Sequence, residues 1–168
     1  MVFSRFGLYS APVPKSTSRE LTEDLFRRLS GQPVSGQADK VILIHTVDEN
    51  GWAHPAVLSY FEVAAKDRSN VRIATYKTSR TTENLRRTGK VTLSVFDERV
   101  AYYIKGSATE LAHEMKTAPH NSKLNIQVEE VLVDQADPVL EPGAYIAGGI
   151  RVVNPNPPAA AVLKELLE

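Results

Sequence analysis

The chain of 168 residues contains no cysteine. This absence excludes disulfide bonds, thiolate metal sites and cysteine nucleophiles together. Histidine is also scarce, and the four histidines lack the close helical spacing of a zinc motif. They are His45, His54, His113 and His120. We therefore expect no metal site.

Long apolar runs and an excess of charge of one sign are missing as well. No run approaches the roughly 18 apolar residues of a membrane span, and the first residues lack the apolar core of a signal peptide. Twenty basic and twenty acidic residues give a formal net charge of +0. No global field would therefore steer the chain towards nucleic acid or an anionic membrane. We expect a cytoplasmic protein that binds neither.

The composition that remains, with 42% hydrophobic and 24% charged residues, is typical of a globular protein with one core. We divide the chain into three parts. Residues 1–33 form an N-terminal arm and a covering helix, in which residues 1–18 are extended and Leu21, Leu25 and Leu29 share one helical face. Residues 34–153 form the main domain. Residues 154–168 form a linker and a short C-terminal helix.

Alternating and β-branched residues predict strands along the main domain. The expected strands cover residues 40–47, 52–63, 71–76, 91–97, 100–111 and 123–133. The turn DENG at 48–51 joins the first two as a hairpin, and Pro55 indicates an edge or a bulge because proline cannot donate to a sheet ladder. Six strands with only peripheral helices predict a mainly β fold, an antiparallel barrel with helical decoration.

Several single residues in these strands carry their own expectations. Glu129 and Glu130 indicate an exposed edge. Gly106 marks either a bulge or a place where a backbone or a cofactor passes closely. The aromatic residues Trp52, Tyr102 and Tyr103 either line a ligand site or a subunit interface, or pack in the core, and we favour the core. None of these residues identifies a particular ligand.

The stretch VRIATYKTSRTTENLRR, residues 71–87, is the most informative part of the chain. It predicts a strand that leads into a short helix through hydroxyl and basic residues. Two interpretations stay open. Ser79 and Thr81 either cap the helix or, with its unsatisfied amides and the cations Lys77 and Arg80, bind a phosphate. Asn84, in the first helical turn, either reaches such a ligand or faces water.

In this order of strands, turn and helix, the chain resembles the pyridoxamine 5'-phosphate oxidase-like family of FMN-binding split barrels. The resemblance covers about residues 34–150 and is carried by the segment from Thr75 to Leu85 and by the strand that ends Ile104-Lys105-Gly106. It implies a six-stranded antiparallel split β-barrel of Greek-key type. It also implies a homodimer that holds FMN in a groove between the subunits.

The resemblance further implies which residues hold the FMN. The backbone of residues 56–60 would lie along the isoalloxazine ring, and the segment around Arg80 would hold the phosphate. The expected FMN-binding residues are Ala56, Val57, Leu58, Ser59, Thr75, Lys77, Ser79, Arg80, Thr81 and Asn84. An FMN phosphate needs a cation and several donors at one end, and the ring needs a flat apolar slot, which agrees with this set.

The chain also departs from the oxidase members of the family. Ala56 and Thr81 stand where those members have an arginine and a lysine that touch the phosphate, and Lys77, Arg86 or Lys105 would have to compensate. The C-terminal Arg and Trp motif for the pyridoxal phosphate substrate is missing. We therefore predict an FMN-dependent oxidoreductase with an unassigned small-molecule substrate, and not a pyridoxamine phosphate oxidase. No general acid or base is evident from the sequence.

Three alternatives remain at this point. In the first, the barrel is a non-catalytic flavin carrier or sensor. In the second, it is a haem-binding split barrel with His113 or His120 as an axial ligand. It could also bind a deazaflavin, which would require a larger basic groove. An absorption spectrum separates flavin, haem and an empty barrel.

Overall fold

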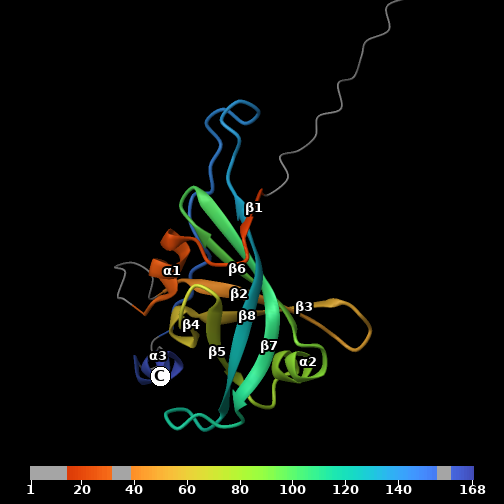
Figure 1. Cartoon of the computed structure of the whole chain (residues 1–168). Helices are drawn as coiled ribbons and strands as arrows, with labels where there is room; N and C mark the ends of the chain where they lie inside the picture. Colours follow the sequence, from red (N-terminus) through yellow and green to blue (C-terminus); the bar gives the residue numbers. More distant parts are fainter. Residues whose placement is uncertain (1–14, 32–38, 155–159) are drawn as a thin grey trace, which may run out of the picture.

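A computed structural model describes residues 15–31, 39–154 and 160–168 of the chain (Figure 1). Of the extended arm expected over residues 1–18, residues 1–14 lie outside the described residues, and Lys15–Ser18 form a strand that pairs with β8 (Asn121–Asp134). The elements are β1 (Lys15–Ser18), α1 (Glu23–Leu29), β2 (Val41–Val47), β3 (Ala53–Ser59), the 3-10 helix η1 (Tyr60–Glu62), β4 (Val63–Ala65), β5 (Asn70–Tyr76), α2 (Arg80–Thr88), β6 (Lys90–Asp97), β7 (Val100–Ala112), β8 (Asn121–Asp134) and α3 (Ala160–Leu167).

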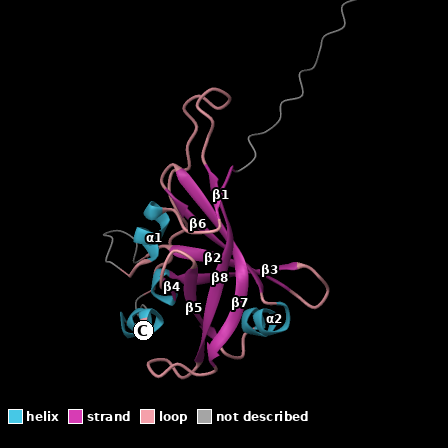
Figure 2. Ribbon diagram, in the orientation of Figure 1, coloured by secondary structure: helices cyan, strands magenta, loops and turns pink. Residues whose placement is uncertain are grey.

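The strands form one antiparallel sheet in the order β3-β2-β6-β7-β8-β5-β4, with β1 paired to β8 outside this path. The sheet curves into a split barrel, and the helices lie at its periphery, with α2 on the side opposite to α1 and α3 (Figure 2). The mainly β class is confirmed. Six strands were expected, and the described residues form eight, because β1 and β4 have only four and three residues and are too short to show an alternating pattern.

The predicted hairpin is present, and its second strand lies at one end of the sheet. Strands β2 and β3 pair from Val41↔Ser59 to Val47↔Ala53. The turn closes on Asp48, whose Oδ1 accepts from the backbone of Asn50 and Trp52 at 2.9 Å each. The edge position indicated by Pro55 is confirmed. The continuous strand expected over 52–63 is wrong, since η1 separates β3 from β4.

One packing expectation concerns β8, and another is corrected at the hairpin turn. The pairing of β8 with β5 ends at Gln127, before Glu129 and Glu130, so β5 does not enclose these two residues. Glu130 accepts from Lys105 Nζ of β7 at 2.9 Å across the strand pair. Trp52 is 73% exposed rather than packed in the core. Tyr102 is buried as expected, and its hydroxyl donates to Asp24 at 2.9 Å.

The glycine in β7 is explained by a close backbone approach. The register between β7 and β8 shifts between Lys105 and Gly106, which marks a β-bulge. A Cβ atom at Gly106 would lie 2.3 Å from the carbonyl oxygen of Gln127. A side chain at this position would therefore push the two strands apart.

Helix α1 covers the sheet as predicted. Thr22 caps it by accepting from the backbone N of Leu25 at 3.2 Å, and the face that carries Leu25 is fully buried. Arg28 contacts the buried Asp97 at the end of β6, and Lys40 Nζ donates to the same carboxylate at 2.7 Å. These ion pairs fix α1 and the start of β2 to one carboxylate.

The C-terminal part returns to the sheet in two places. Lys40 and Arg151 form an isolated antiparallel bridge, and Val152 N donates to Asp39 O at 2.7 Å. The predicted C-terminal helix is confirmed as α3, which packs beside β4 and β5. Its Glu165 accepts from the backbone of Thr117 at 2.8 Å. Among the described residues, no helix is long and apolar enough to cross a membrane.

Candidate functional site

The junction between β5 and α2 is organised by three hydroxyl groups. Ser79 Oγ accepts from Thr82 N at 3.2 Å, which is the capping contact that the sequence predicts. The fully buried Thr82 donates through Oγ1 to Tyr76 O at 2.8 Å and lies 2.6 Å from Thr75 Oγ1. The helix start is therefore held against the end of β5 by side chains that are already paired with one another.

The amide groups of the first turn are only partly used by this cap. The cap accounts for Thr82 N, and Glu83 N donates to Ser79 O at 3.0 Å. The backbone N–H groups of Arg80 and Thr81 have no acceptor in the described part of the chain. Two free amides at a helix N-terminus carry a partial positive charge and suit an anion.

A groove of about 300 Å³ lies between β3 and the start of α2. We call it the β3–α2 groove. Its lining residues are Val41, Ala56, Val57, Leu58, Ser59, Glu62, Thr75, Tyr76, Ser79, Thr81, Val152 and Asn154. Seven of the ten expected FMN-binding residues are among them, so strands and a helix distant in the sequence bring most of the predicted set together.

The contact between α2 and the hairpin shows which part of the groove is near the helix. Asn84 Nδ2 donates to Thr46 Oγ1 at 3.1 Å, and Thr46 pairs with His54 of β3. Counted along β3 from His54, Ala56 is two residues away and Ser59 is five residues away. Because a strand rises by about 3.4 Å per residue, Ser59 lies about 10 Å farther from this anchor than Ala56 does.

The groove therefore has two chemically different ends. The helix end includes Ala56 and the hydroxyl groups of Ser79 and Thr81 from the start of α2. The tail end is lined by Val41, Ser59, Glu62, Val152 and Asn154. The second group is held together because Val41 pairs with Ser59 and its backbone N donates to Ile150 O at 3.0 Å.

The free edge of β3 supplies a backbone donor along the groove. In an antiparallel strand, alternate residues direct their N–H groups away from the neighbouring strand. Ser59 belongs to this outward set, because its N–H donates to Glu62 Oε2 at 2.8 Å. Pro55, four residues earlier, has no N–H to leave unpaired. Val57 lies two residues before Ser59 and belongs to the same alternate set, so its N–H also points away from β2.

Three of the expected residues are not part of the groove lining. Lys77 is paired with Glu114, and Asn84 is buried between Thr46 and Arg87 Nη2, which donates to its Oδ1 at 3.1 Å. Asn84 thus neither faces water nor reaches the groove. The side chain of Arg80 is exposed and has no hydrogen bond or ion pair with any described residue.

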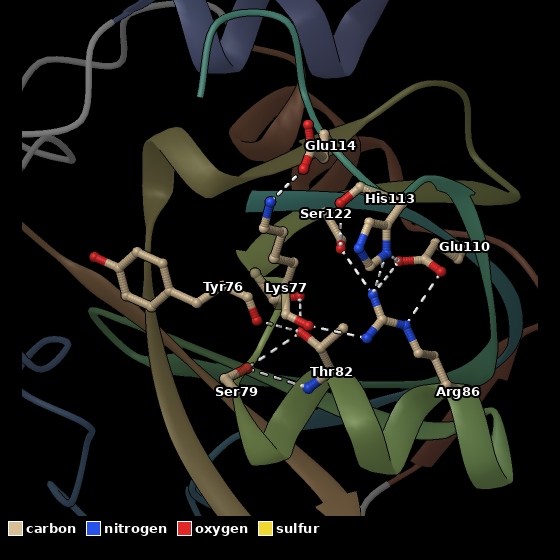
Figure 3. A network of polar contacts seen from close by, with 10 residues as sticks. Tyr76, Lys77, Ser79, Thr82, Arg86, Glu110, His113, Glu114 and Ser122 are labelled. Atoms are coloured by element: carbon tan, nitrogen blue, oxygen red, sulfur yellow. Dashed lines mark hydrogen bonds and ion pairs between the residues drawn. The ribbon is translucent and has the colours of Figure 1, made fainter. Parts of the chain in front are cut away.

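The cations considered as substitutes on sequence grounds are engaged in ion pairs elsewhere. Lys105 pairs with Glu130, and Arg86 forms a bidentate contact with Glu110, with distances of 2.5 and 3.1 Å. Arg86 Nη2 also lies 3.0 Å from His113 Nδ1, and the contact can be followed in Figure 3. The Arg86 guanidinium lowers the pKa of Glu110, and Glu110 in return raises the pKa of Arg86. This network fixes α2 to β7 and to the segment before β8.

The histidine candidates are separate from the groove. His113 contacts Arg86 and Glu110, and the ring of His120 lies 5.6 Å from the ring of Tyr76. Neither histidine lines the β3–α2 groove. The described residues contain no group of three or more His, Asp or Glu side chains that could hold a metal ion.

Some lining residues were not predicted from the sequence. Glu62 accepts from Ser59 through both the backbone N and Oγ, at 2.8 and 3.0 Å. The spacing Ser-x-x-Glu at 59–62 was a readable sign of this contact, since it is the spacing of a capping box. Val152 and Asn154 gave no local signal, because only the bridge between Lys40 and Arg151 brings them to the groove.

The groove fits an FMN in most respects. Its volume is at the lower end of the roughly 300–1,000 Å³ of small-molecule sites. The helix end offers hydroxyls and two free amides for a phosphate, and Val57 and Leu58 offer an apolar wall with a backbone donor. No lysine, arginine or histidine is among the described lining residues, although Arg80 stands in the sequence between the lining residues Ser79 and Thr81.

Comparisons with known proteins agree with the fold. The family model of pyridoxamine 5'-phosphate oxidase matches residues 37–145. The uncharacterised protein YclD of Bacillus subtilis is 34% identical over 132 residues, which cover 79% of this chain and 82% of YclD.

Two solved structures are similar in fold. The HupZ protein of Group A Streptococcus has a TM-score of 0.55 at 15% identity, over 76% of this chain and 99% of that one. A candidate pyridoxamine 5'-phosphate oxidase of Lactobacillus delbrueckii has a TM-score of 0.51 at 19% identity, over 71% and 98%.

Proposed function

This chain belongs to the pyridoxamine 5'-phosphate oxidase-like family, and on that basis we propose that it is an FMN-binding flavoprotein that acts as an FMN-dependent oxidoreductase on a substrate still to be assigned. The observation that carries the proposal is the β3–α2 groove, which gathers seven of the ten residues expected to hold the cofactor. A bound FMN would supply the two-electron chemistry.

In this proposal each end of the groove has its own task. Ser79, Thr81 and the free amides of the first α2 turn bind the phosphate, and Arg80 adds the charge from the rim. Val57 N–H donates to the ring, while the apolar side chains of Val41 and Val152 exclude water from the tail end. The chain thus contributes binding and orientation rather than an acid or a base.

We further propose that two copies of the chain share this site. Val57, Tyr76 and Val152 line the groove and yet are 61%, 62% and 44% exposed. Large apolar side chains exposed around one groove are typical of a surface that a partner covers. A second subunit would bury them and enclose the cofactor. Light scattering at several concentrations measures the mass, and a monomer at all of them would contradict this part.

A second candidate is a flavin carrier without turnover. It is favoured by one observation: the only titratable side chains among the described lining residues are Glu62 and Tyr76. A carrier would retain FMN. When electron donors are supplied, the bound FMN would be reduced and reoxidised no faster than free FMN.

The cofactor is tested by adding FMN, desalting and recording the visible spectrum. The parent protein is expected to retain the flavin bands. Arg80→Ala removes a charge-assisted contact of about 1.5–3 kcal/mol and should weaken FMN binding by about 10- to 100-fold. Arg19→Ala is the matched control, because Arg19 is exposed and does not line the groove. A parent that retains no flavin would contradict the proposal.

A further inference from the structure

The tail end of the β3–α2 groove contains a carboxylate that the phosphate-binding scheme does not use. Glu62 is the only charged side chain among the described lining residues. Within the described residues its carboxylate accepts two hydrogen bonds, and both come from Ser59 and reach the same oxygen, Oε2. The other oxygen, Oε1, has no partner in the described part of the chain. A full negative charge therefore lies in a groove that we assign to an anionic cofactor.

The position of this charge is fixed by the fold. Glu62 closes the short helix η1, and the Ser59 backbone N–H holds the carboxylate back against the end of β3. Along β3, Ser59 lies about 10 Å farther than Ala56 from the contact between Thr46 and Asn84 of α2. With the phosphate at the helix end, Glu62 is on the side of the groove that is left for the ring.

We propose that the negative charge of Glu62 determines which form of the flavin ring binds best at the tail end of the groove. It selects both the oxidation state of the ring and the chemical kind of ring. This inference rests on the proposed FMN function. Two electrons and one proton convert the neutral oxidised ring into a reduced ring with one negative charge. A carboxylate beside the ring repels the reduced form and leaves the neutral form almost unaffected.

The size of the effect follows from the dimensions of the groove. At an effective dielectric constant of about 20, two unit charges within about 12 Å of each other change a binding constant by about tenfold. Water in an open groove screens this to about threefold. Glu62 should therefore weaken the binding of the reduced cofactor by about three- to tenfold relative to the oxidised one. For a two-electron couple this lowers the midpoint potential by about 15–30 mV.

The same charge gives the groove a ring preference. A ring that is already anionic when oxidised, such as an ionised hydroxyl-bearing deazaflavin, would be disfavoured in the same way. A substrate group that approaches the tail end is expected to be neutral or cationic, since Oε1 can accept a hydrogen bond from it. Glu62 thus acts as a specificity residue.

The test is the midpoint potential of FMN bound to the parent, to Glu62→Gln and to two controls. Glutamine keeps an oxygen that accepts from Ser59 and removes the charge, so the potential should rise by about 15–30 mV while the Kd of oxidised FMN changes less than about threefold. Ser59→Ala loses one hydrogen bond to Glu62 but keeps the charge, and should leave the potential within a few mV. Glu49→Gln removes an exposed charge in the hairpin turn and should do the same.

The outcomes separate this inference from the cofactor assignment. If FMN binds and Glu62→Gln leaves the potential unchanged or lower, the role of Glu62 is refuted and the flavoprotein assignment stands. If Ser59→Ala raises the potential as much as Glu62→Gln does, the contact rather than the charge matters, and the inference also fails. If the parent binds no FMN at all, both are overturned.

Discussion

Replacing Gly106 by alanine tests the packing of the largest strand pair in the sheet. The added Cβ would lie 2.3 Å from Gln127 O and 2.7 Å from Ile126 Cγ2. The first of these atoms belongs to the backbone of β8, so the methyl group is accommodated only if the strands separate. Overpacking costs typically about 1–3 kcal/mol, and a clash with backbone atoms places this variant at about 3 kcal/mol, the upper end of the range. For a chain of this size, that loss lowers Tm by at least about 6 °C.

The matched control for this variant is Gly51→Ala. Gly51 has a φ of +84° and nothing within 4 Å of a built Cβ, so the substitution measures backbone strain without a clash. It should cost about 1–2 kcal/mol. Thermal unfolding followed by circular dichroism compares the two. A Gly106→Ala variant that melts no lower than Gly51→Ala would refute the close-approach argument, and one that keeps its Tm but loses FMN would place the cofactor at Gly106 instead.

Three further substitutions follow from single contacts. Glu165→Ala leaves the donors of Thr117 without their acceptor and should cost about 2–4 kcal/mol in urea unfolding, whereas Glu165→Gln should recover part of it; equal losses would contradict this. Thr82→Val removes the buried hydroxyl between Thr75 and Tyr76 and should cost about 1–3 kcal/mol, and an unchanged Tm would contradict it. Burial raises the pKa of Asp24, but the hydrogen bonds from Arg28, Tyr102 and Arg27 outweigh this effect and hold the pKa below its ordinary value. The contribution of Asp24 to stability is therefore present above its ordinary pKa and is lost as the pH falls through the lowered value, so Asp24→Asn should destabilise the protein at pH 7 and lose this acid dependence. An acid-unfolding curve parallel to that of the parent would contradict the last prediction.

The parts of the fold that could be predicted from the sequence are those fixed by local chemistry. The stretch 71–87 was correct as a strand, a capped turn and a helix, because alternation and the cap at Ser79 both depend on residues a few positions apart. The hairpin at 48–51 was correct for the same reason. Such signals need no knowledge of the rest of the chain.

Other features depend on which strands meet, and the sequence did not contain this information in a local form. The ion pair between Glu130 and Lys105 depends on the register of β7 against β8, which no local pattern indicates. Lys77 has the right charge for a phosphate, but its partner Glu114 is 37 positions away and draws it out of the groove. Val152 reaches the groove only through a bridge to residues near the start of β2.

The central claim is that the start of α2 binds the phosphate of FMN. It is tested most directly by measuring the Kd values of FMN and riboflavin in parallel by fluorescence quenching, because the two ligands differ only in the phosphate. Hydrogen bonds to a charged group are worth about 1.5–3 kcal/mol each, so the account predicts that FMN binds at least about tenfold more tightly than riboflavin and that Arg80→Ala reduces this ratio. Equal affinities for FMN and riboflavin would contradict it.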